Sequence, residues 1–250
     1  FRHPETRRPK HRLVLTVKIL VLGDIHSNWA ALSAVAAAEP GPFDACLVTG
    51  DLVDYGSDPR PCLRWVREHA SAVVRGNHDH AVAQRVAARG GSGFKSIAAA
   101  TRPLHWQVLG REDLKFLARL PVTCRLSVGD KSFFLVHGTP RDPMDEYLGG
   151  DRAAWNSRLE FVEADYVLVG HTHVPYALEV GKTTVLNPGS VGQPRDGDPR
   201  AAYAVICDGT IDFRRVEYDI DAAVEHLRAS GVRGEALSIA ELALRTGGTG

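Results

Sequence analysis

The first motif of this chain is Lys18-Ile-Leu-Val-Leu-Gly-Asp-Ile-His26, in which a short apolar run leads directly into a glycine, a carboxylate and an imidazole. In four further stretches, at 47–51, 73–79, 134–137 and 167–173, an apolar run again leads directly into a polar motif. The apolar runs predict strands, and helical patterns at 29–38 and 61–69 between the first three predict parallel pairing through right-handed crossovers. Ligands of such sheets bind outside the carboxyl ends of the strands. We therefore predict an α/β fold with its polar motifs gathered at one edge.

The composition excludes several classes of protein. The chain has 250 residues, of which 44% are hydrophobic and 24% charged, and its 30 Lys and Arg balance 30 Asp and Glu. These values exclude an intrinsically disordered chain, and zero net charge gives no general attraction for nucleic acid or an anionic membrane. The four cysteines form no C-x-x-C pair, so neither a disulfide framework nor a thiolate zinc site is expected. Reduced thiols indicate a cytoplasmic protein.

Three segments describe the expected domain organisation. Residues 1–16 are predicted to be a basic, poorly ordered extension, with a nucleic-acid-binding arm as the alternative. We expect no signal peptide, because the apolar run that starts after Lys18 leads into the first motif without a small-residue cleavage site. Residues 17–230 read as a single domain, in which 81–120 form a small helical cap broken at Pro103 and 176–217 form one antiparallel series of strands. Residues 231–250 read as a C-terminal helix and a flexible tail.

The polar residues of the five motifs have the chemistry of a metal site. Carboxylate, imidazole and amide groups suit Mn, Fe, Zn, Ni or Co, and seven candidates are too many for one ion but fill two sites if one carboxylate bridges. Two such ions form a clamp for displacement at phosphorus. A lone Gly-Asp is usually a turn and a lone His usually structural, so the prediction depends on the motifs occurring together. The candidates are Asp24, His26, Asp51, Asn77, His137, His171 and His173.

Taken together, the motifs resemble the signature of the calcineurin-like metallophosphoesterases. They are Gly23-Asp-Ile-His26, Gly50-Asp51, Gly76-Asn-His-Asp79, His137-Gly138 and Gly170-His-Thr-His173, in a match that extends over about residues 18–217. The stretches 24–28, 51–56 and 186–195 resemble a bacterial phosphodiesterase-type branch. The resemblance implies two packed mixed β-sheets flanked by helices, a four-layer α/β/β/α sandwich, with two divalent ions at the strand ends, Mn²⁺ first among them.

The resemblance also implies a role for each residue. One ion takes Asp24, His26, Asp51 and His173, and the other takes Asp51, Asn77, His137 and His171, with Asp51 bridging. A hydroxide between the ions is the implied nucleophile, since bound metals lower the pKa of water to about 7. His78 lies over the substrate, and Asp79 holds its imidazole. Arg75 is the residue expected to grip phosphate, while Arg195, Arg141 and Tyr55 are further candidates for the rim.

The implied function is hydrolysis of phosphodiester or phosphomonoester bonds in small molecules or nucleotides. The protein-phosphatase branch typically has Glu where this chain has Asp79 and Gly where it has Ser27, which disfavours a Ser/Thr protein phosphatase without excluding it. The motifs are also compatible with a dinucleoside polyphosphate hydrolase and with a catalytically silent scaffold of the same fold. An exonuclease would need a basic groove, which the balanced charge does not indicate. The sequence leaves the substrate and the oligomeric state open.

Overall fold

The first strand, β1 (Lys18–Leu22), lies at the centre of a mixed five-stranded sheet in the computed structural model, which describes residues 16–248. It pairs in parallel with β2 (Ala45–Val48), which pairs in parallel with β3 (Ala72–Val73). Helices α1 (Trp29–Ala38) and α2 (Pro59–His69) make the two crossovers. On its other side β1 pairs antiparallel with β9 (Ala201–Cys207), beside β10 (Thr210–Val216). The strand order is β10-β9-β1-β2-β3.

A second five-stranded sheet has the order β4-β5-β6-β8-β7. Its strands β5 (Lys131–Val136), β6 (Tyr166–Leu168) and β8 (Thr183–Asn187) are parallel, and β4 (Thr123–Val128) and β7 (Tyr176–Val180) pair antiparallel at the edges. The predicted single antiparallel series over 176–217 is therefore wrong. It is two hairpins in different sheets, because the segment between β8 and β9 carries the chain from one sheet to the other. Turn residues identify hairpins but not the sheet that each one joins.

The two sheets share one apolar core. Ile19, Val21 and Leu47 of the first sheet pack in one cluster with Phe133 and Leu135 of the second. Alternate residues of β1 and β2 face the other way and pack with residues of α1 and α2. On the far side of the second sheet, α6 (Arg152–Arg158) buries Trp155 completely. Strands buried on both faces explain the continuous apolar runs. The predicted two-sheet sandwich flanked by helices is confirmed.

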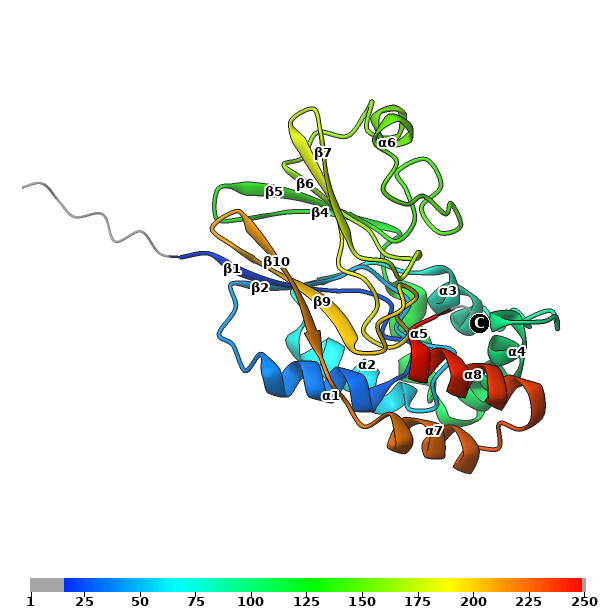
Figure 1. Cartoon of the computed structure of the whole chain (residues 1–250). Coiled ribbons are helices and arrows are strands. Elements are labelled where there is room, and N and C mark those ends of the chain that lie inside the picture. Colours follow the sequence, from blue (N-terminus) through cyan, green and yellow to red (C-terminus); the bar gives the residue numbers. More distant parts are fainter. Residues whose placement is uncertain (1–15, 249–250) are drawn as a thin grey trace, which may run out of the picture.

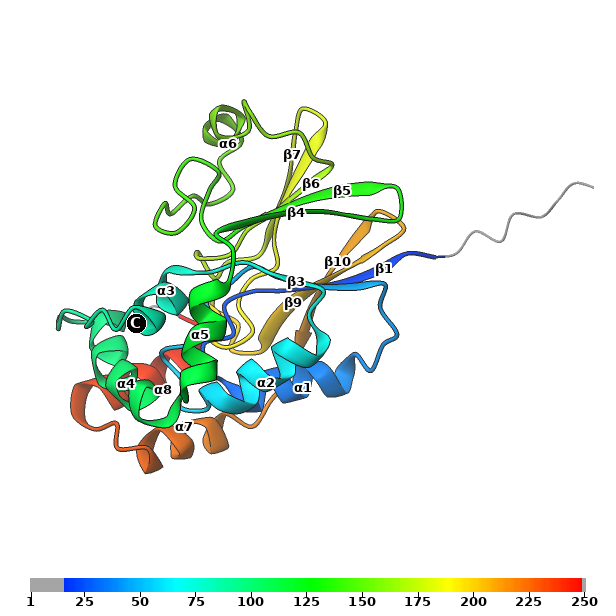
Figure 2. The ribbon, with the colours of Figure 1, turned by 180° about the vertical axis from the view of Figure 1, so that it is seen from behind.

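The remaining helices gather at one end of both sheets. They are α3 (Asn77–Ala83), α4 (Phe94–Val108), α5 (Arg111–Arg119), α7 (Ile220–Ala229) and α8 (Gly234–Thr246). Figure 1 shows α3, α4, α5 and α8 at this end, and the reverse view in Figure 2 agrees. Helix α4 continues through Pro103, where we predicted a break; its buried face, with Ile97 and Ala98 in the cluster shared with α7 and α8, holds it together despite the missing hydrogen bond.

The C-terminal helix expected within 231–250 is α8, which packs against α4 and α7. The basic extension predicted for 1–16 lies, apart from residue 16, outside the described residues, as do the last two residues of the tail. Within residues 16–248, none of the helices combines the length and apolarity needed to cross a membrane.

Candidate metal centre

The polar motifs meet where strands of both sheets end. Asp24 follows β1, Asp51 follows β2, Asn77 follows β3, and His137 follows β5. The loops after β1 and β2 run side by side, because Asp24 N donates to the Gly50 carbonyl (3.1 Å) and His26 N donates to the Asp51 carbonyl (2.9 Å). The sandwich thus places the loop that follows β6, with His171 and His173, opposite the loops of the first sheet.

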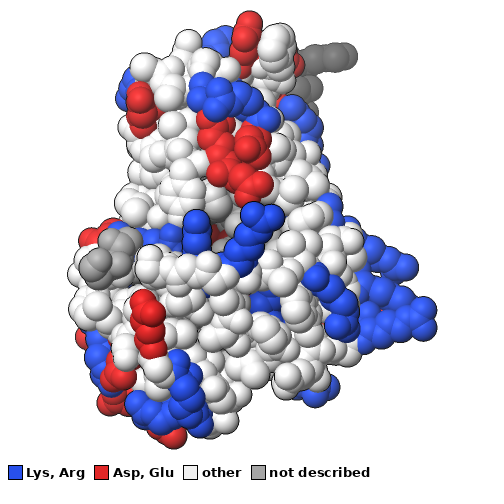
Figure 3. All heavy atoms as spheres, turned by 90° about the vertical axis from the view of Figure 1, so that its right-hand side faces the viewer, with Lys and Arg blue, Asp and Glu red and all other residues white. Residues whose placement is uncertain are grey.

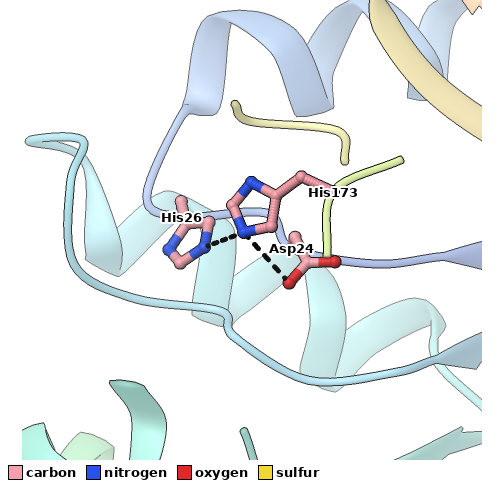
Figure 4. A group of neighbouring side chains, drawn as sticks. All are labelled: Asp24, His26 and His173. Atoms are coloured by element: carbon pink, nitrogen blue, oxygen red, sulfur yellow. Dashed lines mark hydrogen bonds and ion pairs between the residues drawn. The ribbon is translucent and has the colours of Figure 1, made fainter. Parts of the chain in front are cut away.

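One group of potential ligands consists of Asp24, His26 and His173 (Figure 4). The Nε2 atoms of His26 and His173 lie 3.2 Å apart, and His173 Nε2 lies 3.4 Å from Asp24 Oδ1. All three residues are at most 2% exposed. Figure 4 shows the two imidazole rings and the carboxylate pointing toward one another, Asp24 and His26 from the loop after β1 and His173 from a separate segment.

The second group consists of Asp51, His137 and His171. His137 Nε2 lies 3.1 Å from His171 Nδ1 and 3.2 Å from Asp51 Oδ2. The same Asp51 oxygen lies 3.7 Å from His26 Nε2, which belongs to the first group. Asp51 Oδ2 is therefore within reach of both groups, as a bridging carboxylate requires.

Hydrogen bonds to the backbone turn three of the histidines toward the centre. The Nδ1 atoms of His26, His137 and His173 lie 2.9, 2.9 and 2.6 Å from the carbonyl oxygens of Val53, Thr49 and Gln193. An Nδ1–H that donates to a carbonyl leaves the Nε2 lone pair free for a metal, which is the usual outer-shell arrangement of metal-binding histidines.

Unpartnered polar atoms in the centre fit the binding of cations. Asp24 Oδ2 and Asn77 Oδ1 are buried and have no hydrogen-bond partner among residues 16–248. A buried acceptor without a partner costs free energy. The facing lone pairs of His26 and His173 repel each other unless a proton or a metal lies between them. A divalent cation in each group relieves both costs, and carboxylate, imidazole and amide ligands suit such ions.

The backbone of the centre is strained at the candidate ligands themselves. Asp24, His26, Asp51, His171 and His173 all have φ between 47° and 66°, a left-handed conformation that costs about 1–3 kcal/mol for a residue other than glycine. Strain of this kind concentrates at functional sites, where the surrounding structure maintains it.

One neighbouring position admits only glycine. A Cβ on Gly76 would lie 2.0 Å from Asp51 Oδ1. The Gly-Asn-His sequence therefore places the start of α3 directly against the Asp51 carboxylate, and His78 N donates to Asp51 Oδ1 at 2.9 Å.

The structure assigns the partner of His78 differently from the sequence. We predicted that Asp79 holds the His78 ring, but Asp79 accepts from the backbone N–H groups of Leu52 (2.8 Å) and Gly76 (3.0 Å) and so caps α3. It is Asp54, fully buried, that accepts from His78 Nδ1 at 2.7 Å. Asp54 also accepts from Arg102 Nε (2.9 Å), on the cap helix α4. Asp54 follows Asp51 by three residues, within the stretch 51–56 that resembles the phosphodiesterase-type branch, but no local pattern gave it a role.

The candidate residue for binding phosphate also changes, from Arg75 to Arg195. Arg75 directs Nη1 to the Ala118 carbonyl (3.2 Å) and does not line the cavity at the metal centre. Arg195 lines it, beside His171 and His173. Its Nη1 donates to the Tyr147 hydroxyl, its guanidinium lies 4.1 Å from the centre of the Phe94 ring, and its Nε has no partner.

A cavity of about 370 Å³ opens over both groups of ligands. Asp51, Asn77 and His78 form part of its wall, and residues 87–89, Lys95, Ala98 and Arg102 come from the cap segment. Small-molecule sites commonly have volumes of about 300–1,000 Å³, so the cavity has the size of a small-molecule site.

Comparison with known proteins assigns the family. A family model described as "Calcineurin-like phosphoesterase superfamily domain" matches residues 17–209. The chain belongs to the calcineurin-like phosphoesterase superfamily. The superfamily expected from the motifs is thus confirmed, while the bacterial branch stays a prediction.

Three proteins are similar to this phosphoesterase-family chain over most of their length. An uncharacterised protein of Methanocaldococcus jannaschii is 33% identical over 230 residues, which are 84% of this chain and 91% of that protein. The crystal structure of a metallophosphoesterase from Sphaerobacter thermophilus is 32% identical with a TM-score of 0.76, covering 93% of this chain and all of that one. A hypothetical protein from Pyrococcus horikoshii shares the fold, at 23% identity and a TM-score of 0.78 over 94% of this chain and all of that one.

Without metal, the centre of this calcineurin-like chain retains protons. Burial raises the pKa of Asp24 to about 7. Burial opposes protonation of His137, but the nearby Asp51 carboxylate outweighs it and raises the pKa of His137 to about 9. His26 behaves in the opposite way, because burial lowers its pKa to about 3. At pH 7 the metal-free centre therefore holds a proton on His137, and the Asp24 carboxyl is about half protonated.

Binding of Mn²⁺ at pH 7 is expected to release about one to two protons, because His137 and Asp24 ligate only when deprotonated. The apparent affinity therefore weakens as the pH falls from 9 to 6. Titration calorimetry in two buffers of different ionisation enthalpy measures the protons released. A binding enthalpy independent of the buffer would contradict this description of the centre.

Proposed function

We propose that this protein is a metal-dependent phosphoesterase that hydrolyses phosphodiester or phosphomonoester bonds of small molecules or nucleotides. The observation that carries the proposal is the pair of ligand groups that share Asp51 Oδ2, with Asn77 Oδ1 unpartnered beside them. Two bound divalent ions, Mn²⁺ first among the candidates, supply activation of water and neutralisation of phosphoryl charge. Asp24, His26, Asp51 and His173 hold one ion, and Asp51, Asn77, His137 and His171 hold the other.

In this proposal His78 is the proton donor to the leaving oxygen. Its Nδ1 is occupied by Asp54, so Nε2 is the ring nitrogen available to the cavity. Burial opposes protonation of the ring, but the Asp51 and Asp54 carboxylates outweigh it and raise the pKa of His78. A histidine that retains its proton near neutral pH suits a general acid. Asp54, itself held by Arg102, is the positioning residue.

We assign Arg195 to bind the phosphate oxygens of the substrate. No carboxylate among the described residues forms an ion pair with its guanidinium, which the Phe94 ring and the Tyr147 hydroxyl hold at the cavity wall. A guanidinium can donate to two phosphate oxygens at once. Pre-ordering by Phe94 and Tyr147 lowers the entropy that such binding costs.

The walls of the cavity favour direct hydrolysis of a small substrate. Among the described residues that line it there is no Ser, Thr or Cys, so the proposal includes no covalent intermediate on such a side chain. Residues 87–98 of the cap wall one side, which favours a small molecule over the broad contact that a protein substrate needs. All four cysteines are free, in keeping with the proposed cytoplasmic location.

Removal of metal tests the proposal directly. Hydrolysis of an aryl phosphate or a bis-aryl phosphodiester should stop after chelation and return with Mn²⁺. Asp51→Asn should lower kcat by at least about 1,000-fold, because the bridging charge is lost while the shape is kept. Thermal unfolding checks that the variant folds. Chelator-resistant hydrolysis, or an active Asp51→Asn protein, would rule out the proposed mechanism.

Two arginines form a matched pair for the substrate contact. Arg195→Ala should lower kcat/KM by about 100-fold, the usual effect of removing a donor to a phosphoryl or oxyanion oxygen. Arg75→Ala should change kcat/KM by less than about threefold, since Arg75 donates to a backbone carbonyl of α5 instead. Steady-state kinetics on one substrate measures both variants. If kcat/KM fell more in Arg75→Ala than in Arg195→Ala, Arg75 and not Arg195 would be the residue that binds phosphate, as the sequence predicted.

A further inference from the structure

The cavity is unusually rich in positive charge for a chain whose net charge is zero. Its described lining residues include four cations, namely Arg89, Lys95, Arg102 and Arg195, and a single carboxylate, Asp51. Asp51 lies at the metal end, where divalent ions would more than neutralise it. In Figure 3, Lys and Arg side chains gather at the middle of this face, between the upper and lower parts of the molecule.

Two of the four cations already have roles within the centre. Arg102 donates to Asp54, and the two charges compensate each other. Arg195 contacts Tyr147 and Phe94 beside the metal ligands. Arg89 and Lys95 are exposed, and among residues 16–248 no carboxylate forms an ion pair with either one.

Arg89 and Lys95 line the same cavity as Arg195, the residue assigned to bind phosphate. Lys95 directly follows Phe94, whose ring lies 4.1 Å from the Arg195 guanidinium. Arg89 and Lys95 thus belong to the cap segment that also supplies the aromatic ring packed on Arg195, and all three cations line one cavity. A group bound by Arg89 and Lys95 would be part of the same small molecule whose phosphate contacts Arg195.

The positive charge of Lys95 does not stabilise helix α4 of the cap segment. It lies in the first turn of α4, which holds no acidic residue and has no side-chain cap. A positive charge there is unfavourable, because the helix dipole makes the N-terminus positive as well. Lys95 therefore gains no stabilisation from its place in α4, and its charge is available to an anion in the cavity.

We propose that the substrate carries a second phosphate group, on the portion that leaves, and that Arg89 and Lys95 bind it. The inference rests on the proposed phosphoesterase function and names its substrate class: small bisphosphorylated molecules, such as a nucleoside or sugar bisphosphate. A volume of about 370 Å³ accommodates one such molecule. Two further cations in the cavity wall give such a molecule an advantage over the matching monophosphate.

A long polyanion fits the entrance less well. The 142–147 segment beside His171 holds Asp142, Asp145 and Glu146, of which only Glu146 is paired with arginines, Arg141 and Arg158. Acidic side chains form a group above the basic ones in Figure 3. Repulsion from unpaired carboxylates disfavours the extended phosphate backbone of a nucleic acid.

Matched substrates and matched variants test this inference. The Mn²⁺-loaded full chain is assayed for phosphate release with adenosine 3′-monophosphate against adenosine 3′,5′-bisphosphate, and fructose 1-phosphate against fructose 1,6-bisphosphate. In at least one pair, kcat/KM should be about tenfold or more higher for the bisphosphate. Arg89→Ala/Lys95→Ala should remove most of that preference. Arg85→Ala/Arg111→Ala, which removes two exposed cap arginines outside the cavity, should keep it.

A binding measurement separates recognition from turnover. Calorimetry with adenosine 3′,5′-bisphosphate and the metal-free protein should show an affinity about tenfold weaker in Arg89→Ala/Lys95→Ala than in Arg85→Ala/Arg111→Ala. Three outcomes would overturn the inference if aryl phosphates are still hydrolysed. These are equal turnover of mono- and bisphosphates, a bisphosphate preference that survives loss of Arg89 and Lys95, and faster cleavage of an oligonucleotide. Failure on every phosphate ester would instead refute the proposed function, and the inference with it.

Discussion

The geometry of the centre depends on the carboxylate of Asp51. One oxygen lies within 3.7 Å of a histidine from each ligand group, and the other accepts the backbone N–H of His78. The carboxylate therefore fixes the spacing of the two candidate metal sites and the start of α3 together. Gly76 leaves room for this contact, since a Cβ there would overlap Asp51 Oδ1. The parallel pairing of β2 and β3 brings the two turns together, and the hydrogen bond from His78 N to Asp51 Oδ1 fixes the position of His78.

The sandwich fold makes this arrangement possible by supporting strained loops. Five candidate ligand residues have left-handed backbone conformations, at a cost of about 1–3 kcal/mol each. The strands that precede them are completely or almost completely buried, and the loops of β1 and β2 hydrogen-bond to each other. Rigid support of this kind keeps polar groups aimed at a common point before any ligand arrives, which reduces the reorganisation that binding requires.

The sequence predicted the strands and the polar residues that follow them because each of these signals is local, whereas the two-sheet sandwich and the division of the ligands into two groups came from the resemblance to a family. A ligand directly follows its strand, so a prediction of the strand also places the ligand. Side chains whose partners lie far along the chain were not predictable in this way. Asp79 is next to His78, yet neighbouring residues of a helix face different directions, and Asp54, 24 residues away, reaches the ring instead. The two separate hairpins depend on how the 188–200 segment crosses between sheets, which no local pattern encodes. The same segment brings Arg195, which was expected only at the rim, to the cavity beside His171 and His173.

The most direct test of the bridged centre is anomalous X-ray diffraction from crystals of the Mn²⁺-loaded protein. We predict two anomalous peaks about 3.5–4 Å apart, one against Asp24, His26 and His173, the other against His137 and His171, with Asp51 contacting both. A single peak, or two peaks that do not share Asp51, would contradict the bridging role on which the proposed function depends.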